Sequence, residues 1–264
     1  MNTLTNLMFW YCAYQGIRSC RRNGHDKVFE VAYYGYLLVG LGSFMFHTSL
    51  KYGWQLVDEL NMIYTTALMG FASLSHRRST TYQILLGVGS VVFCLGVTAY
   101  YHYIQDPDFH QNVYAAMTIW LVFRSAAKME NALRPSWRHS EEKDRLAKEK
   151  KGLPVLSREE QDIVNKRDLK MLHQMWSLVV WGVAMFLTGF ALWTIDNVYC
   201  SQLRSWRRAV GLPWGVVLEG HAWWHIFTGY GECGRAWSPT FGQVTDMVKE
   251  HTATSFGAFI YDIY

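Results

Sequence analysis

The chain has 264 residues, of which half are hydrophobic and 16% are aromatic, and its formal net charge at pH 7 is +4. This charge is small and dispersed, which argues against nucleic acid as a partner, because binding to a phosphate backbone needs a concentrated basic surface. The 12 Trp and 16 Tyr residues are instead typical of a membrane protein with aromatic belts at both interfaces.

Seven apolar stretches predict membrane-spanning helices, since a span needs about 20 predominantly apolar residues. In chain order they cover residues 2–17, 29–50, 54–75, 81–103, 110–127, 171–195 and 213–232. The first is short, so we expect a short or incomplete span there. The sequence Asp106-Pro107-Asp108 predicts a turn between the fourth and fifth stretches. The predicted fold class is therefore an all-α membrane protein, a seven-transmembrane helix bundle.

Nearly half of the charged residues, of both signs, fall in one hydrophilic segment, residues 129–170, which we expect to be a charged cytosolic loop. Basic residues also follow the first and third predicted spans, on the same side as this loop. The positive-inside rule then places the amino terminus in the lumen and the carboxyl terminus in the cytosol. Arg204, Arg207 and Arg208 fall on the opposite side and argue against this orientation. We expect one seven-helix domain over residues 1–232 and an extramembranous tail over residues 233–264.

Polar and ionisable side chains gather in two regions of the predicted bundle. Ser43 and His47 are four residues apart and share a helix face, as do His221 and His225 in the last span. Asp58 stands near the start of the third span. Ionisable groups in membrane helices are costly and mark functional sites. Three histidines and a carboxylate at similar depth predict a zinc site with an open position for water.

Each of these residues also has a structural explanation that the sequence leaves open. A lone histidine in an apolar helix is commonly a hydrogen-bonded core residue. Asp58 at a helix start interacts favourably with the helix dipole without any catalytic role. Asp196, at the end of the sixth span, is equally compatible with a structural or a functional role.

Three segments carry a resemblance to a known family: GSFMFHTSLKYGWQLVDELNMIY (42–64), WTIDNVYC (193–200) and GHAWWHIFTG (220–229). With these segments, the chain resembles the alkaline ceramidases from about Asn2 to Gly231, with residues 129–170 as a variable insertion. These enzymes belong to a wider superfamily of seven-helix hydrolases that includes adiponectin receptors.

The resemblance implies that His47, His221 and His225 bind zinc, with Ser43 and Asp58 as the accompanying catalytic groups. It implies hydrolysis of the ceramide amide to a sphingoid base and a fatty acid, by a multi-pass protein of the endoplasmic reticulum or Golgi membrane. Asn61 replaces a proline that is common in the family. The family's acidic calcium-binding segment does not precede Met1, so we expect the calcium site to be lost and the activity to be weak.

The sequence is also compatible with other members of the superfamily, but not with two other classes of membrane protein. A lipid-sensing receptor of the same superfamily would keep the zinc ligands, and a truncated, inactive family member would also fit. A retinal-type receptor is disfavoured because residues 213–232 contain no lysine for a Schiff base. A diiron desaturase is disfavoured because the chain has a single HxxxH pair.

Overall fold

The computed structural model describes residues 1–23, 27–75, 78–135 and 157–236. Within these ranges the chain forms helices joined by short turns and no strand, which confirms the all-α prediction. The elements are α1 (Asn2–Thr5), α2 (Leu7–Asn23), α3 (Lys27–Ser49), α4 (Tyr52–Ser75), α5 (Thr80–Ile104), α6 (Pro107–Leu133), α8 (Arg158–Val198), α9 (Cys200–Val210), the 3-10 helix η2 (Trp214–Leu218) and α10 (Gly220–Ala236).

Local sequence signals explain where several of these helices begin. The Ser79 side chain accepts a hydrogen bond from the first turn of α5, so it acts as the N-cap. Asp106 caps α6 in the same way, and Pro107 occupies the first position of that helix, where a missing N–H costs nothing. Ser157 and Glu160 form a capping box at the start of α8. The turn predicted around Pro107 is present.

The charged segment differs from the prediction of a loop over residues 129–170. The helix α6 continues to Leu133 and α8 already begins at Arg158, so both ends of the segment are helical. Charge indicates exposure to water but does not oppose helix formation, because Lys, Arg and Glu are good helix formers. The rest of the predicted loop, residues 136–156, lies outside the described residues.

The last predicted span, residues 213–232, is not one continuous helix. It consists of the short helix η2 followed by α10, with Glu219 in a non-helical conformation between them. His221 therefore lies in the first turn of α10, whereas a continuous helix over residues 213–232 would put it about two turns from the helix start. Residues 237–264, most of the predicted tail, lie outside the described residues.

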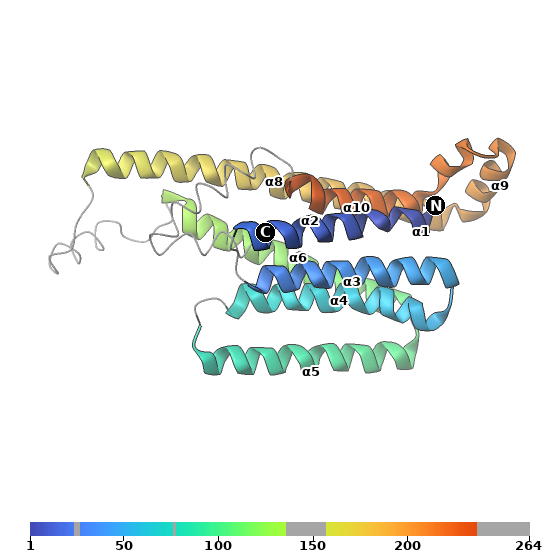
Figure 1. Cartoon of the computed structure of the whole chain (residues 1–264), viewed down its shortest axis with the longest axis horizontal. Helices are drawn as coiled ribbons and strands as arrows, with labels where there is room; N and C mark the ends of the chain where they lie inside the picture. Colours follow the sequence, from blue (N-terminus) through green and yellow to red (C-terminus); the bar gives the residue numbers. More distant parts are fainter. Residues whose placement is uncertain (24–26, 76–77, 136–156, 237–264) are drawn as a thin grey trace.

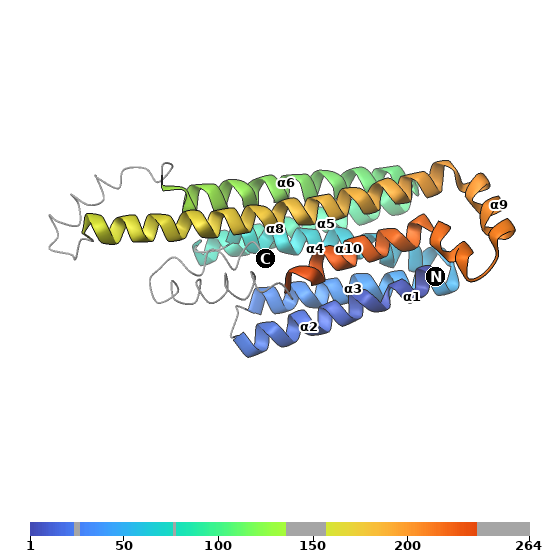
Figure 2. The ribbon, with the colours of Figure 1, turned by 90° about the horizontal axis from the view of Figure 1, so that it is seen from above.

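The long helices lie side by side in one bundle (Figures 1 and 2). In the described part of the chain, α2, α3, α4, α6, α8 and α10 each pack against the next, and α10 returns to α2 to close the circuit. The helix α5 packs against α4 outside this circuit. The short helix α1 contacts both α3 and α10, and therefore bridges two helices that are not neighbours in the circuit.

Two of the described helices, α5 and α8, are long and apolar enough to cross a membrane. Their apolar side chains point mostly away from the protein, since only 11% of the most apolar stretch of each helix is buried. In α5, for example, Leu85 is 68% exposed and Leu95 is 64% exposed. An apolar surface of this kind is suited to contact with lipid rather than water. The seven-span arrangement as a whole stays a prediction.

Candidate metal centre

The side chains of the three histidines singled out in the sequence come together, His47 from α3 and His221 and His225 from α10. One potential ligand atom from each of His47, His221 and His225 lies within 4.8 Å of those of the other two. The Nε2 atoms of His47 and His221 are 3.1 Å apart. Zinc–nitrogen bonds of about 2.0–2.1 Å in a tetrahedral site place ligand nitrogens roughly 3.3 Å apart. The spacing of these two nitrogens therefore fits a shared metal ion.

The helix α1 supplies oxygen atoms that hold His225. The Nδ1 nitrogen of His225 lies 2.9 Å from Thr5 Oγ1 and 3.2 Å from the Asn2 carbonyl oxygen. The Thr5 hydroxyl itself donates a hydrogen bond to the Asn2 carbonyl oxygen at 3.0 Å. A proton on Nδ1 that is donated to these oxygens leaves the lone pair on Nε2, as a metal ligand requires. On the other side, the Thr3 hydroxyl donates to the carbonyl oxygen of His47 at 3.2 Å. The first turn of the chain thus connects both histidine-bearing helices.

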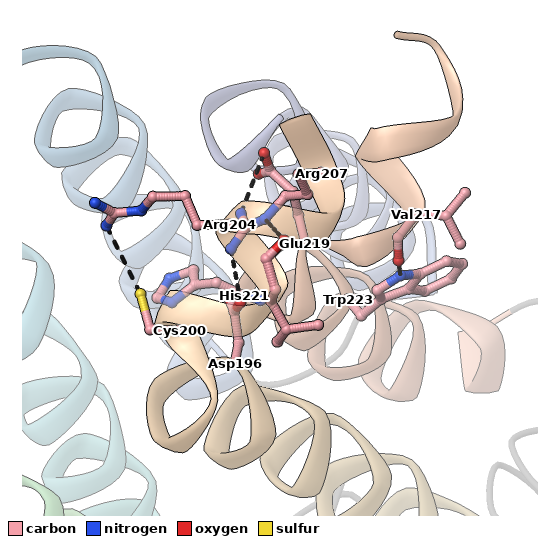
Figure 3. Close-up of polar contacts among 9 residues, drawn as sticks. Asp196, Cys200, Arg204, Arg207, Val217, Glu219, His221 and Trp223 are labelled. Atoms are coloured by element: carbon pink, nitrogen blue, oxygen red, sulfur yellow. Dashed lines mark hydrogen bonds and ion pairs between the residues drawn. The ribbon is translucent and has the colours of Figure 1, made fainter. Parts of the chain in front are cut away.

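A charged network holds the start of α10, which carries His221 (Figure 3). One carboxylate oxygen of Asp196, in α8, accepts a hydrogen bond from the backbone N–H of His221 at 3.2 Å. The other accepts a hydrogen bond from Arg207, in α9, at 3.1 Å. The Arg207 guanidinium also lies 3.6 Å from Glu219, directly before α10. Asp196 therefore satisfies a backbone donor in the first turn of α10 that has no partner within the helix.

Gly220 allows α10 to begin directly against the backbone of α8. A Cβ atom at this position would lie 2.4 Å from the Leu192 carbonyl oxygen and 2.8 Å from the Asp196 Cβ atom. Neither atom belongs to a flexible side-chain end, so a larger residue would push the helices apart. The position of His221 depends on this close contact.

Ser43, in α3, and Asp58, in α4, lie near each other, and the Ser43 hydroxyl interacts with the Asp58 carboxylate. Ser43 is buried and lies one helical turn before His47, on the same face of α3. The two helices approach closely here because Gly42 has no side chain: a Cβ atom would lie 3.2 Å from the Asp58 backbone nitrogen. The structure therefore brings together the two polar residues that the sequence had singled out beside the histidines.

The neighbouring carboxylate, Glu59, has different partners. It accepts hydrogen bonds from the Tyr101 hydroxyl and, at 3.1 Å, from the Gln55 amide. These contacts place Glu59 in the packing between α4 and α5 and not beside Ser43. Adjacent carboxylates in the sequence thus have separate roles in the structure.

Comparison with known proteins identifies the family. The family model described as Ceramidase matches residues 1–262. The chain belongs to the ceramidase family. It is 32% identical over 237 residues to alkaline ceramidase 3 of Mus musculus, an alignment that covers 87% of this chain and 72% of the mouse protein. It is 30% identical over 243 residues to alkaline ceramidase YPC1 of Saccharomyces cerevisiae, covering 87% of this chain and 66% of the yeast protein.

A third ceramidase, from Arabidopsis thaliana, is 23% identical over 234 residues, covering 87% of this chain and 71% of the plant protein. The resemblance carried by the three sequence segments is thereby confirmed. The family match also extends beyond Gly231, where the resemblance noted in the sequence ended. The chain spans about two thirds to three quarters of the length of these relatives.

The donor set of this ceramidase-family chain fits a zinc ion. Imidazole nitrogens are suitable ligands for zinc, and three protein ligands leave a fourth tetrahedral position open, as in catalytic zinc sites. Sequence reasoning missed Asn2, Thr5 and Arg207. Arg207 carried a signal, because it is a basic residue on the side of the membrane where the positive-inside rule expects few. Asn2 and Thr5 carried none, because their contacts join residues more than 200 positions apart.

Proposed function

We propose that this chain hydrolyses the N-acyl amide bond of ceramides at a zinc site within the membrane, releasing a sphingoid base and a fatty acid. The observation that best supports the proposal is the cluster of His47, His221 and His225 beside the Ser43–Asp58 pair. The names of the matched relatives describe them as alkaline ceramidases, which points to the same substrate class.

The three histidines would hold the zinc ion through their ring nitrogens. Bound zinc supplies a Lewis acid that polarises the amide carbonyl and acidifies a water molecule. Ser43 and His225 are buried and have little contact with solvent, whereas His47 and His221 are partly exposed. Electrostatic interactions at the site are stronger there than in water.

Asp58 is the proposed proton carrier. Its carboxylate takes the proton from the water that attacks the carbonyl carbon, and delivers it to the amide nitrogen as the carbon–nitrogen bond breaks. Before the reaction, the Ser43 hydroxyl donates to the Asp58 carboxylate. Once Asp58 is protonated it is a weaker acceptor, so the Ser43 hydroxyl is free to donate to the developing oxyanion.

The membrane supplies both the substrate and the apolar surroundings. We propose that the long helices span the bilayer, with the amino terminus in the lumen and the charged segment in the cytosol, in the endoplasmic reticulum or Golgi. The exposed apolar surfaces of α5 and α8 support membrane embedding. A lipid with two chains would then reach the site laterally. Membership of the ceramidase family does not favour the alternative of a lipid-sensing receptor. The alternative of an inactive family member is not favoured either, because the chain has all five residues that the resemblance implies for the site.

The test is release of sphingoid base from ceramide by the purified protein in lipid nanodiscs, measured by mass spectrometry. We expect Asp58→Asn to lower kcat by about 100- to 10,000-fold, the usual contribution of a general acid–base group. Glu59→Gln is the matched control, because it changes the adjacent carboxylate, and it should retain most of the activity. No product from the wild type, or equal activity of wild type and Asp58→Asn, would contradict the proposal.

A further inference from the structure

The helix α9 has two chemically different faces. Leu203, Trp206 and Val210 follow one another at intervals of three and four residues and form an apolar stripe. Arg204 and Arg208, four residues apart, lie on the opposite face, and the helix contains no acidic residue. A short helix with this separation is typical of segments that lie in a membrane–water interface.

The apolar stripe is exposed at its most hydrophobic positions. Trp206 is 59% exposed and Val210 is 52% exposed. The exposed apolar surface continues in the following turn, where Leu212 is 85% exposed and Trp214 is 71% exposed. Two exposed tryptophans beside arginines match the composition of interfacial belts, in which the indole ring sits at the level of the lipid headgroups.

The position of α9 in the fold agrees with such a location. It follows α8 after the single residue Tyr199, and α8 is one of the two described helices able to cross a membrane. In Figure 2, α9 crosses the end of the bundle between α8 and the start of α10. A helix placed across the end of membrane-spanning helices lies at the depth of the membrane surface.

Contacts to the bundle fix which way the two faces of α9 point. Arg207 lies between the apolar stripe and the basic face, and it is paired with Asp196 and Glu219 (Figure 3). This contact turns Arg207 toward the bundle. The apolar stripe therefore lies on one side of α9, as seen from the bundle, and Arg204 and Arg208 lie on the other side. The Arg204 guanidinium contacts the Cys200 sulfur at 3.7 Å and remains exposed.

We propose that α9 binds the interfacial region of the bilayer that the chain spans. Leu203, Trp206 and Val210 enter the boundary between acyl chains and headgroups, while Arg204 and Arg208 contact lipid phosphate. Long arginine side chains reach a phosphate while their stems stay along apolar surface. The proposal rests on the membrane embedding in the proposed function. It also explains why these arginines oppose the positive-inside rule: they are anchors on the membrane surface.

The test uses the full chain in phospholipid nanodiscs, with the photo-crosslinking residue benzoylphenylalanine placed at one position at a time. Two variants probe the apolar stripe: Trp206→benzoylphenylalanine and Val210→benzoylphenylalanine. If one of them does not fold, the other still tests the proposal. Ser201, exposed on the polar side of α9, is the matched control on the same helix. Leu85, exposed in α5, reports on membrane embedding itself. Lipid adducts are quantified by mass spectrometry after illumination.

We expect several-fold more lipid adduct at position 206 or 210 than at 201, and adducts at 85. Adducts at 85 with equal labelling of 206, 210 and 201 would overturn the proposal for α9 and leave membrane embedding intact. A crosslinked dimer through position 206 in place of lipid adducts would show that the stripe is an interface between two copies, and would also overturn it. Absence of lipid adducts at 85 as well as at 206 and 210 would contradict the membrane embedding on which the proposal rests.

Discussion

The Nδ1 nitrogen of His225 lies 2.9 Å from the Oγ1 oxygen of Thr5, a residue 220 positions away in the sequence. This contact joins the first turn of the chain to the helix that carries two of the three proposed zinc ligands. Hydrogen bonds of this kind fix the tautomer and ring orientation of a metal-binding histidine. The amino-terminal turn is therefore expected to support metal binding without touching the metal.

The first prediction concerns this hydrogen bond. Thr5→Val keeps the shape of the side chain but removes the oxygen that faces His225. We expect the zinc affinity to fall by about tenfold, the lower end of the usual range for such supporting contacts, because the Asn2 carbonyl oxygen remains near Nδ1. Competition with a zinc chelator measures the affinity. Thr5→Ser retains the hydroxyl and is the control, so equal affinities for the Val and Ser variants would contradict the role of Thr5.

The second prediction concerns Asp196, which holds the start of α10. Asp196→Ala removes both the acceptor for the His221 N–H and the partner of Arg207, whereas Asp196→Asn can keep the first contact. Loss of a helix-capping acceptor costs about 0.5–2 kcal/mol. We expect zinc affinity and kcat to fall more in Asp196→Ala than in Asp196→Asn. If the two variants behave alike and match the wild type, the network does not position His221.

The third prediction concerns the contact between α8 and α10. In Gly220→Ala, the added Cβ atom would collide with the Leu192 carbonyl oxygen, and overpacking of this kind costs about 1–3 kcal/mol. We expect a lower midpoint of thermal unfolding and weaker zinc binding. Gly96→Ala is the matched control, since a Cβ atom there meets nothing within 4 Å and α5 is helical around it. A Gly220→Ala protein as stable as the Gly96→Ala protein would show that α10 can shift without cost.

The histidine cluster could be predicted from the sequence because its signals are local. His221 and His225 are one helical turn apart, as are Ser43 and His47, and the order of the apolar stretches places both pairs at one depth. The remaining parts of the site depend on contacts between distant segments. Nothing near Thr5 in the sequence indicates that its hydroxyl lies beside His225, because the bridging position of α1 arises only when the bundle is assembled.

The errors in the predicted elements have similar causes. Residues 213–232 are apolar throughout and were interpreted as one helix, but the close approach of Gly220 to α8 and the Asp196 contact define a new helix start. The charged segment was interpreted as a loop, although its composition indicates only exposure to water and its Ser157 capping box begins a long helix. The expectations about calcium and about the cytosolic side of this segment stay predictions.

The central claim is that His47, His221 and His225 hold one catalytic zinc ion. The most direct measurement is the metal content of the purified wild type and of the double variant His221→Ala/His225→Ala, determined by elemental analysis. His102→Ala, which changes an exposed histidine of α5, is the control for general effects of losing an imidazole. The account predicts one zinc per chain in the wild type and in His102→Ala, and loss of zinc from the double variant. Full zinc retention by the double variant would contradict it.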